Sequence, residues 1–171
     1  MHCIEISHMT IQTERLTLRA WEESDAKALF ALASDPCVGK SAGWNPHLTL
    51  DESLEVIRTV FSKPEVYAIT LRSSGEIAGC IGLANGADAH TPLADGESEI
   101  GYWLGVPYWN KGLMMEAAAA LIRHAFNVLG LKGIHGCCFR NNHRSTRVLE
   151  RCGFIWKKTR GGMKYFYLKA K

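Results

Sequence analysis

The chain has 171 residues, 47% of them hydrophobic, and a formal net charge of +3 at pH 7. That length and apolar content suffice for one buried core, so we expect a lead-in at residues 1–10 and a single domain at residues 11–171. Acidic and basic residues are interleaved, and no apolar run approaches the roughly 20 residues that span a bilayer, so neither a nucleic-acid-binding surface nor a membrane segment is expected.

The first elements of the domain are predicted to be a strand and a helix. The strand covers residues 16–19, and the helix begins after Ser24, a good N-cap residue, and ends at Asp35-Pro36. A loop at residues 37–48 follows, with Trp44 near its centre. In a loop between helices, such an aromatic residue either covers the core or contacts a substrate.

A second helix and a pair of strands come next. Thr49 and Glu52 have the spacing of a capping box and predict a helix start. Residues 66–71 and 77–83 alternate as two strands around a Ser-Ser-Gly turn. Residues 84–96 then form a polar loop, whose length alone assigns it no function.

The clearest pattern in the chain is a strand, a glycine-interrupted loop and a long helix. The strand covers residues 99–104, and the helix starts at Leu113, with Gly130 as its C-terminal cap. The first N–H groups of such a helix lack intrahelical partners, and Lys111 adds a cation beside them. This unit is therefore a candidate anion site.

The last part of the chain is predicted to contain a strand at residues 133–139, a helix at residues 142–152 and a hairpin around Gly161-Gly162. Asn142 is a good N-cap, and Ser145 lies on the apolar stripe of the helix. The alternation of strands and helices, ending in an antiparallel hairpin, indicates an α/β or α+β fold with a mixed sheet.

The six cysteines have no regular spacing, and the chain does not begin with the charged and apolar pattern of a signal peptide. We therefore expect reduced thiols and a cytoplasmic location. Cys137 and Cys138 are adjacent on a predicted strand, so they should point to opposite faces and lack the geometry of a zinc site. No metal is expected.

Several of these motifs resemble one family of enzymes. They are EIGYWLGVPYWNKGLMMEA at residues 99–117, NNHRS at residues 141–145 and LERCGF at residues 149–154. In this order they resemble the acetyl-CoA site of the GNAT N-acetyltransferase superfamily. TERLTLR at residues 13–19 is similar to the entry of its RimJ/RimL-like branch, and the likeness covers roughly residues 11–169.

The resemblance implies the GNAT fold, a mixed and mostly antiparallel sheet of about seven strands with helices on both faces. In that fold two central strands splay apart and leave a slot for the pantetheine arm of acetyl-CoA. The resemblance also implies which residues contact acetyl-CoA. They are Trp103, Leu104 and Val106 through free backbone groups, Lys111, Gly112, Leu113 and Met114 at the pyrophosphate, and Asn142 at the pantetheine.

The sequence departs from the family pattern (Q/R)xxGx(G/A), which aligns with residues 109–114. Trp109 replaces the polar residue and Met114 replaces the small one. Gly112 is retained at the position where the backbone comes closest to phosphate. Met114 either narrows that approach or points into the core, and the core position is favoured.

Acetyl transfer to an amine needs a proton acceptor. A Glu at residue 99 resembles the carboxylate of the branch, so Glu99 is the candidate base, acting directly or through water. Glu97 lies on the same strand face, and a solvated strand-edge carboxylate is the structural alternative.

At the position where many members carry a tyrosine acid, this chain has Leu149, so Ser145 is the candidate hydroxyl for the thiolate. A plain N-cap with a small inward residue is the alternative for Asn142 and Ser145.

The resemblance thus implies direct transfer of an acetyl group from acetyl-CoA to a primary amine, on a protein N-terminus or a small molecule. The alternative is a non-catalytic acyl-CoA-binding or sensing module of the same fold. Trp44 is the candidate wall of the acceptor site. The aromatic residues of the C-terminal hairpin are compatible with a homodimer edge or with a core, and no motif specifies the acceptor.

Overall fold

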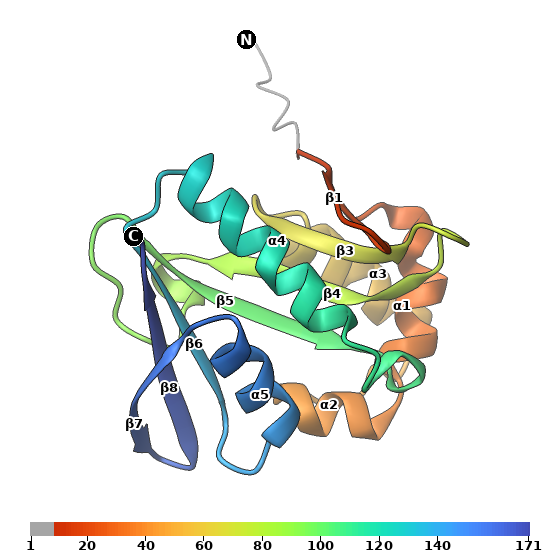
Figure 1. The fold of residues 1–171 in the computed structure, drawn as a ribbon. Coiled ribbons are helices and arrows are strands. Elements are labelled where there is room, and N and C mark those ends of the chain that lie inside the picture. The colour runs from red at the N-terminus through yellow and green to blue at the C-terminus, as the bar shows by residue number, and fades with distance from the viewer. Residues whose placement is uncertain (1–8) are drawn as a thin grey trace, which may run out of the picture.

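The computed structural model describes residues 9–171 of the chain (Figure 1). In this part, the helices pack on one mixed sheet. The strand order is β1-β2-β3-β4-β5-β6-β8-β7, and within the described residues only β5 and β6 pair in parallel. The strands are β1 (Ile11–Gln12), β2 (Leu16–Arg19), β3 (Val66–Leu71), β4 (Ile77–Ala84), β5 (Glu97–Leu104), β6 (Gly133–Phe139), β7 (Ile155–Arg160) and β8 (Met163–Lys169). The predicted mixed, mostly antiparallel sheet is confirmed, with eight strands in place of about seven.

The extra strand is β1, two residues that pair antiparallel with β2. It lies close to the predicted lead-in at residues 1–10, of which residues 1–8 fall outside the described part of the chain.

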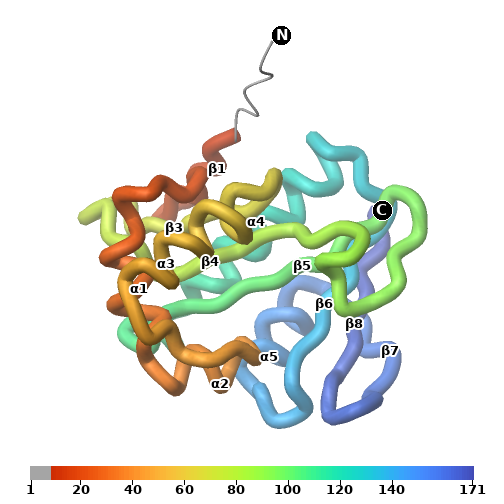
Figure 2. Tube along the Cα trace, turned by 180° about the vertical axis from the view of Figure 1, so that it is seen from behind, coloured from red at the N-terminus to blue at the C-terminus, as the bar shows by residue number. Residues whose placement is uncertain are grey.

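Helices cover both faces of the sheet, as predicted. Views from opposite sides show α4 and α5 over one face and α1 and α3 over the other (Figures 1 and 2). The helices are α1 (Ala26–Ala33), α2 (Pro36–Ala42), α3 (Leu50–Val56), α4 (Leu113–Asn127) and α5 (His143–Arg151). In residues 9–171, no helix is long and apolar enough to cross a membrane.

The two faces of the sheet bury separate apolar clusters. Alternation along β3 places Tyr67 and Ile69 in the cluster under α4, and Ala68 in the cluster under α1. Leu121 of α4 and Leu29 of α1 are fully buried in these two clusters. The three-layer arrangement is therefore set by side-chain alternation in the strands and by one apolar face on each helix.

The loop predicted at residues 37–48 is wrong in its first half, where α2 lies. The Asp35 carboxylate accepts a hydrogen bond from the N–H of Cys37 at 2.8 Å, and Pro36 occupies the first turn. Proline needs no hydrogen-bond partner there and its φ suits a helix. The Asp-Pro pair that ends α1 therefore also starts α2.

The helix caps give a mixed result. The N-cap predicted at Ser24 is wrong, because Ser24 lies inside a short 3-10 turn that precedes α1. The N-cap of that turn is Glu22, whose N–H donates to the Asp25 carboxylate at 2.9 Å. The N-cap predicted at Thr49 is confirmed, because its hydroxyl accepts from the N–H of Glu52 at 3.1 Å.

β5 and β6 pair over only part of their length. Their register runs from Glu97 opposite Gly133 to Ile100 opposite Gly136. β5 nevertheless continues to Leu104, still paired with β4, while β6 continues along β8. The two central strands therefore diverge, as the resemblance implies, and leave one edge of β5 open.

The C-terminal hairpin turns at Gly161 and Gly162, as predicted, and both have positive φ angles, of 58° and 78°. Its aromatic residues differ in burial, and the predicted homodimer edge stays a prediction. Phe166 is 1% exposed and belongs to the core, whereas Trp156 on the edge strand β7 is 54% exposed.

Candidate functional site

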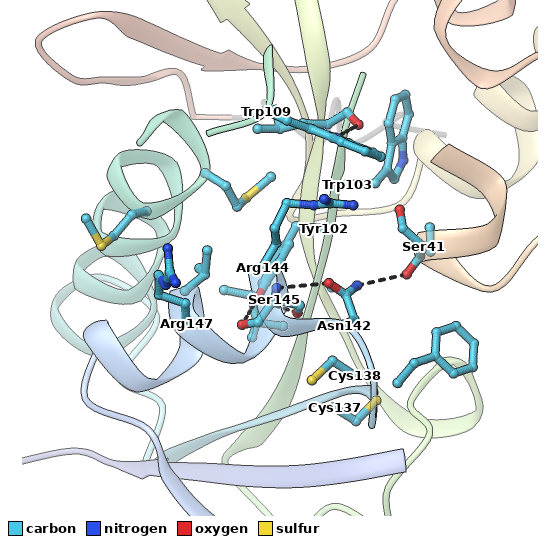
Figure 3. Close-up of a pocket in the computed structure, with 18 of the residues that line it drawn as sticks. Ser41, Tyr102, Trp103, Trp109, Cys137, Cys138, Asn142, Arg144, Ser145 and Arg147 are labelled. Carbon is cyan, nitrogen blue, oxygen red and sulfur yellow. Dashed lines mark hydrogen bonds between the residues drawn. The ribbon is translucent and has the colours of Figure 1, made fainter. Parts of the chain in front are cut away.

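A pocket of about 650 Å³ occupies the opening between β5 and β6. It is lined by residues 99–104 of β5, the end of β6, the first turn of α4, one side of α5 and the end of α2 (Figure 3). Most of the predicted site residues line it. They are Glu99, Trp103, Leu104, Gly112, Leu113, Met114, Asn142 and Ser145.

Three predicted site residues lie outside this lining. Val106 packs against the cluster under α1. The ammonium of Lys111 lies 6.0 Å from the ring centre of Tyr108. Trp44 packs edge-on against Trp103, with 5.8 Å between ring centres. Contacts of these three residues with a ligand therefore stay predictions.

Glu99 is only 3% exposed, so it is not a solvated strand-edge carboxylate. Its Oε1 bonds the backbone N–H and the Nδ1 of His90, at 3.1 and 2.7 Å. Its Oε2 accepts from the N–H and the hydroxyl of Thr91, at 3.0 and 2.7 Å. The Cys137 thiol lies 3.7 Å from Oε1, and burial together with the Glu99 charge raises the pKa of this thiol to about 12.

Glu97, the other carboxylate of this strand face, does not line the pocket. Its two oxygens bond Nε2 of His135 at 2.7 Å and the hydroxyl of Tyr167 at 2.8 Å. The hydrogen bond from His135 is the main reason that the pKa of Glu97 is lowered. Of the two candidates, Glu99 is thus the carboxylate of the pocket wall.

Ser145 pairs with a tyrosine on β5. Its Oγ lies 3.0 Å from the phenol oxygen of Tyr102, and burial raises the pKa of that phenol. Leu149, at the position where the family carries a helix tyrosine, is 2% exposed and packs over Gly136. The pocket wall therefore has a tyrosine hydroxyl from β5, that of Tyr102, whereas the helix position has Leu149.

The first turn of α4 follows a loop with two left-handed residues. Asn110 has a φ of 60° and the N-cap Gly112 a φ of 74°. Arg15 fixes the loop, because its guanidinium donates to the Lys111 carbonyl at 3.0 Å and forms an ion pair with Glu116 at 2.7 Å. The N–H groups of this first turn lack intrahelical partners, which suits an anion.

Both departures from the family pattern have a structural role. Met114 is 7% exposed and belongs to the core, the position that the sequence favours. The indole N–H of Trp109 donates to the Leu104 carbonyl at 2.8 Å, and the Arg144 guanidinium stacks 3.7 Å from the centre of a Trp109 ring. The Leu104 carbonyl is therefore not free, and a ligand contact there would need its second lone pair.

Asn142 joins α5 to α2. Its side-chain oxygen accepts from the N–H of Ser145 at 3.1 Å, which confirms the predicted N-cap. Its Nδ2 donates to the carbonyl of Ser41 at 3.1 Å (Figure 3). One amide hydrogen of Asn142 remains for a ligand, because an amide NH2 group has two.

Sequence reasoning missed several residues of the pocket. His90 lies in a loop without a readable motif, and Tyr102 lies on the opposite strand face from Glu99. Arg147 and Arg151 also line the pocket, and their spacing from Arg144, three and seven residues, is the helical signal that could have identified them.

The diverging strands, the glycine-started helix and the pocket between them have the arrangement of the GNAT fold. The chain belongs to the GNAT family of acetyltransferases: the family described as "Acetyltransferase (GNAT) domain" matches residues 15–155.

Relatives and solved structures agree with this assignment. The chain is 31% identical over 167 residues to "Uncharacterized N-acetyltransferase p20" of Bacillus licheniformis, covering 95% of this chain and 89% of the relative. It is 33% identical over 90 residues to YdaF of Bacillus subtilis (strain 168), named as a candidate ribosomal N-acetyltransferase, covering 52% and 46%. A GNAT acetyltransferase structure from Bacillus anthracis shares the fold, with a TM-score of 0.81, 23% identity and coverage of 94% and 98%. The protein is an N-acetyltransferase, and these relatives are consistent with the RimJ/RimL-like branch.

Proposed function

We propose that the protein transfers the acetyl group of acetyl-CoA to a primary amine by direct attack in a ternary complex. Bound acetyl-CoA supplies an activated acyl group, whose leaving thiol has a pKa of about 8.5 by analogy with cysteine. The observation that carries this proposal is one continuous pocket, which extends from the first turn of α4 along the open edge of β5 to Glu99.

The two ends of this pocket suit the two substrates. At one end, the first turn of α4 after Gly112 and the arginines of α5 offer N–H groups and positive charge for the pyrophosphate, with Lys111 nearby. Asn142 and the backbone of β5 are assigned to the pantetheine arm. The Ser145 hydroxyl is assigned to the leaving sulfur, and Glu99 to the side of the amine.

Direct transfer is favoured over a covalent acetyl-cysteine by the surroundings of Cys137 and Cys138, the two cysteines that line the pocket. Burial raises the pKa of Cys137 to about 12, so it remains a neutral thiol, and the buried Cys138 has its Sγ 3.5 Å from the Thr146 hydroxyl, which is not a base. A nucleophilic cysteine requires the opposite shift.

The acceptor that we propose to test first is the α-amine of a protein N-terminus, because YdaF is named as a candidate ribosomal N-acetyltransferase. Small primary amines are the second class. The expected cytoplasmic location stays a prediction.

The experiment is a thiol-release assay with acetyl-CoA and a panel of N-terminal peptides, polyamines, amino acids and aminoglycosides, with products identified by mass spectrometry. We expect amine-dependent CoA release and a stoichiometric acetylated product. Stoichiometric binding of acetyl-CoA without CoA release across the panel would instead support the non-catalytic binding module.

A further inference from the structure

Glu99 has no free position at which an amine could bind. A carboxylate offers about four lone-pair sites, and four groups of His90 and Thr91 already occupy those of Glu99. An amine that delivered its proton to Glu99 would have to break one of these bonds inside a buried site.

His90 has the free lone pair that Glu99 lacks. Oε1 of Glu99 accepts a hydrogen bond from the backbone N–H of His90, so this oxygen acts as an acceptor toward His90. The 2.7 Å bond to the ring then needs its proton on Nδ1, which leaves Nε2 as an acceptor. Within residues 9–171, no hydrogen bond engages Nε2.

The position of His90 suits proton transfer. The residue lines the pocket together with Glu99, and its side chain is 73% exposed, so a proton on the ring can pass to water. The titratable groups that face it are Glu99 on β5 and Cys137 on β6, and the cations of the pocket are Arg144, Arg147 and Arg151 on α5.

We propose that Nε2 of His90 accepts the proton of the acceptor amine and that Glu99 is a positioning residue, which fixes the ring and its tautomer. This inference rests on the proposed acetyl transfer. In the step, the amine nitrogen forms a bond to the thioester carbonyl carbon and the C–S bond breaks, with its electron pair going to sulfur. One N–H proton moves to Nε2 and then to water.

The same cluster contains an alternative chemistry that the experiment must separate. His90, Glu99 and Cys137 place one possible metal-ligand atom each within 4.8 Å of one another. All assays are therefore run on protein dialysed against EDTA, with and without added zinc. Activity that depended on zinc would assign the cluster to a metal and overturn the proton-acceptor role.

The test compares His90→Ala, Glu99→Gln and the double variant, at saturating acetyl-CoA. We expect each single variant to lower kcat by about 100-fold or more, and the double variant to be no worse than the poorer single one, because the two residues act as a unit. His90→Ala should also change the dependence of kcat/KM on pH, which a purely structural role would leave unaltered. Its Kd for acetyl-CoA should stay within about twofold of the wild-type value.

Chemical rescue distinguishes the two roles. Because the His90 ring is exposed, added imidazole should enter the space left in His90→Ala and restore kcat in proportion to its concentration. Imidazole should not rescue Glu99→Gln, which retains its histidine. His143→Gln serves as the matched control, since this exposed histidine does not line the pocket.

Besides zinc-dependent activity, two results would overturn the inference. The first is a His90→Ala variant with wild-type kcat and pH profile while Glu99→Gln is inactive, which would make Glu99 the direct base. The second is additive losses without imidazole rescue, which would indicate a structural effect only. A wild-type protein that acetylates no amine would instead refute the proposed function, and this inference with it.

Discussion

Tyr102 and Ser145 place two hydroxyl groups 3.0 Å apart on one wall of the pocket. Burial raises the pKa of Tyr102, so its phenol stays protonated and can donate toward Ser145. The Ser145 hydroxyl can then donate to a developing thiolate. A thiol with a pKa of about 8.5 needs little acid assistance near neutral pH, so the contribution of this pair should be modest.

Replacing either hydroxyl should therefore reduce turnover without preventing cofactor binding. We expect Ser145→Ala and Tyr102→Phe each to lower kcat by roughly 10-fold, at the weak end of acid–base effects, with the Kd for acetyl-CoA nearly unchanged. Steady-state kinetics and calorimetry check this. Tyr165→Phe, outside the pocket lining, is the control, and an equal loss of kcat and acetyl-CoA affinity in Ser145→Ala would show that Ser145 only positions the ligand.

The sequence predicts individual residues only where a local period or cap determines their position. Asn142 is recognisable as an N-cap, and Ser145 follows from its place on the helix. The partner of Ser145, however, is Tyr102, 43 positions away on β5, and the partner of Glu99 is His90 in an irregular loop. These pairs depend on strand divergence and loop conformation, which no sequence period encodes.

At the scale of elements, the start of α4 depends on the left-handed conformation of Gly112, whose φ is 74°. An alanine there meets no backbone, since the nearest atom to its Cβ would be the Arg15 side chain at 3.6 Å. A substitution at Gly112 therefore costs free energy of folding because a residue with a Cβ disfavours this positive φ, and not because the Cβ would clash with a neighbour.

Gly112→Ala should destabilise the protein by about 1 kcal/mol, or about 2–4 °C in Tm, and should also weaken acetyl-CoA binding because the first-turn N–H groups would shift. Gly75→Ala is the matched control. Gly75 has a φ of 75°, lies in the β3–β4 turn and has open space around its Cβ. Thermal unfolding should show similar losses for both variants, and calorimetry a loss of affinity for Gly112→Ala alone. Equal affinities would remove Gly112 from the binding site.

The strands were the most predictable elements. Residues 66–71, predicted from side-chain alternation, and residues 133–139, predicted as a short apolar strand, are strands with the bounds that the structure shows. α2 escapes prediction because it has only seven residues, and its Asp-Pro start also has the pattern of a helix end. Short helices lack the repeated apolar period that identifies α4, so their starts must be inferred from caps alone.

At the scale of the whole molecule, Glu97 joins three strands through side-chain bonds. Its carboxylate on β5 contacts His135 on β6 and Tyr167 on β8. The hydrogen bond from His135 is the main cause of its lowered pKa. A carboxyl whose folded pKa is depressed stabilises the fold above its unfolded pKa, about 4.3, and loses this contribution as the pH falls through the folded value.

Glu97→Gln should therefore lower Tm at pH 7 and flatten the fall of Tm between about pH 5 and pH 3. Thermal unfolding at a series of pH values measures both effects. Glu14→Gln, an exposed carboxylate that does not bond these strands, is the control. If Glu97→Gln and wild type lost stability in parallel on acidification, the three-strand contact would contribute nothing to acid stability.

Acetyl-CoA binding should be visible in the stability of the whole domain, because the pocket is built from α2, β5, β6, α4 and α5 together. A ligand at a hundredfold over its Kd adds about 2.7 kcal/mol to the free energy of unfolding. For a chain of this size, that corresponds to a rise of about 5–11 °C in Tm.

We expect acetyl-CoA and CoA to raise Tm comparably, since both carry the pantetheine and the pyrophosphate, and ATP to raise it far less. A rise in Tm with ATP equal to that with CoA would show that the site binds only the phosphate groups, at α4, and does not recognise the pantetheine arm. No rise with any of the three, in a folded protein, would mean that the pocket does not bind the cofactor, and the proposed acetyl transfer would then lack its donor.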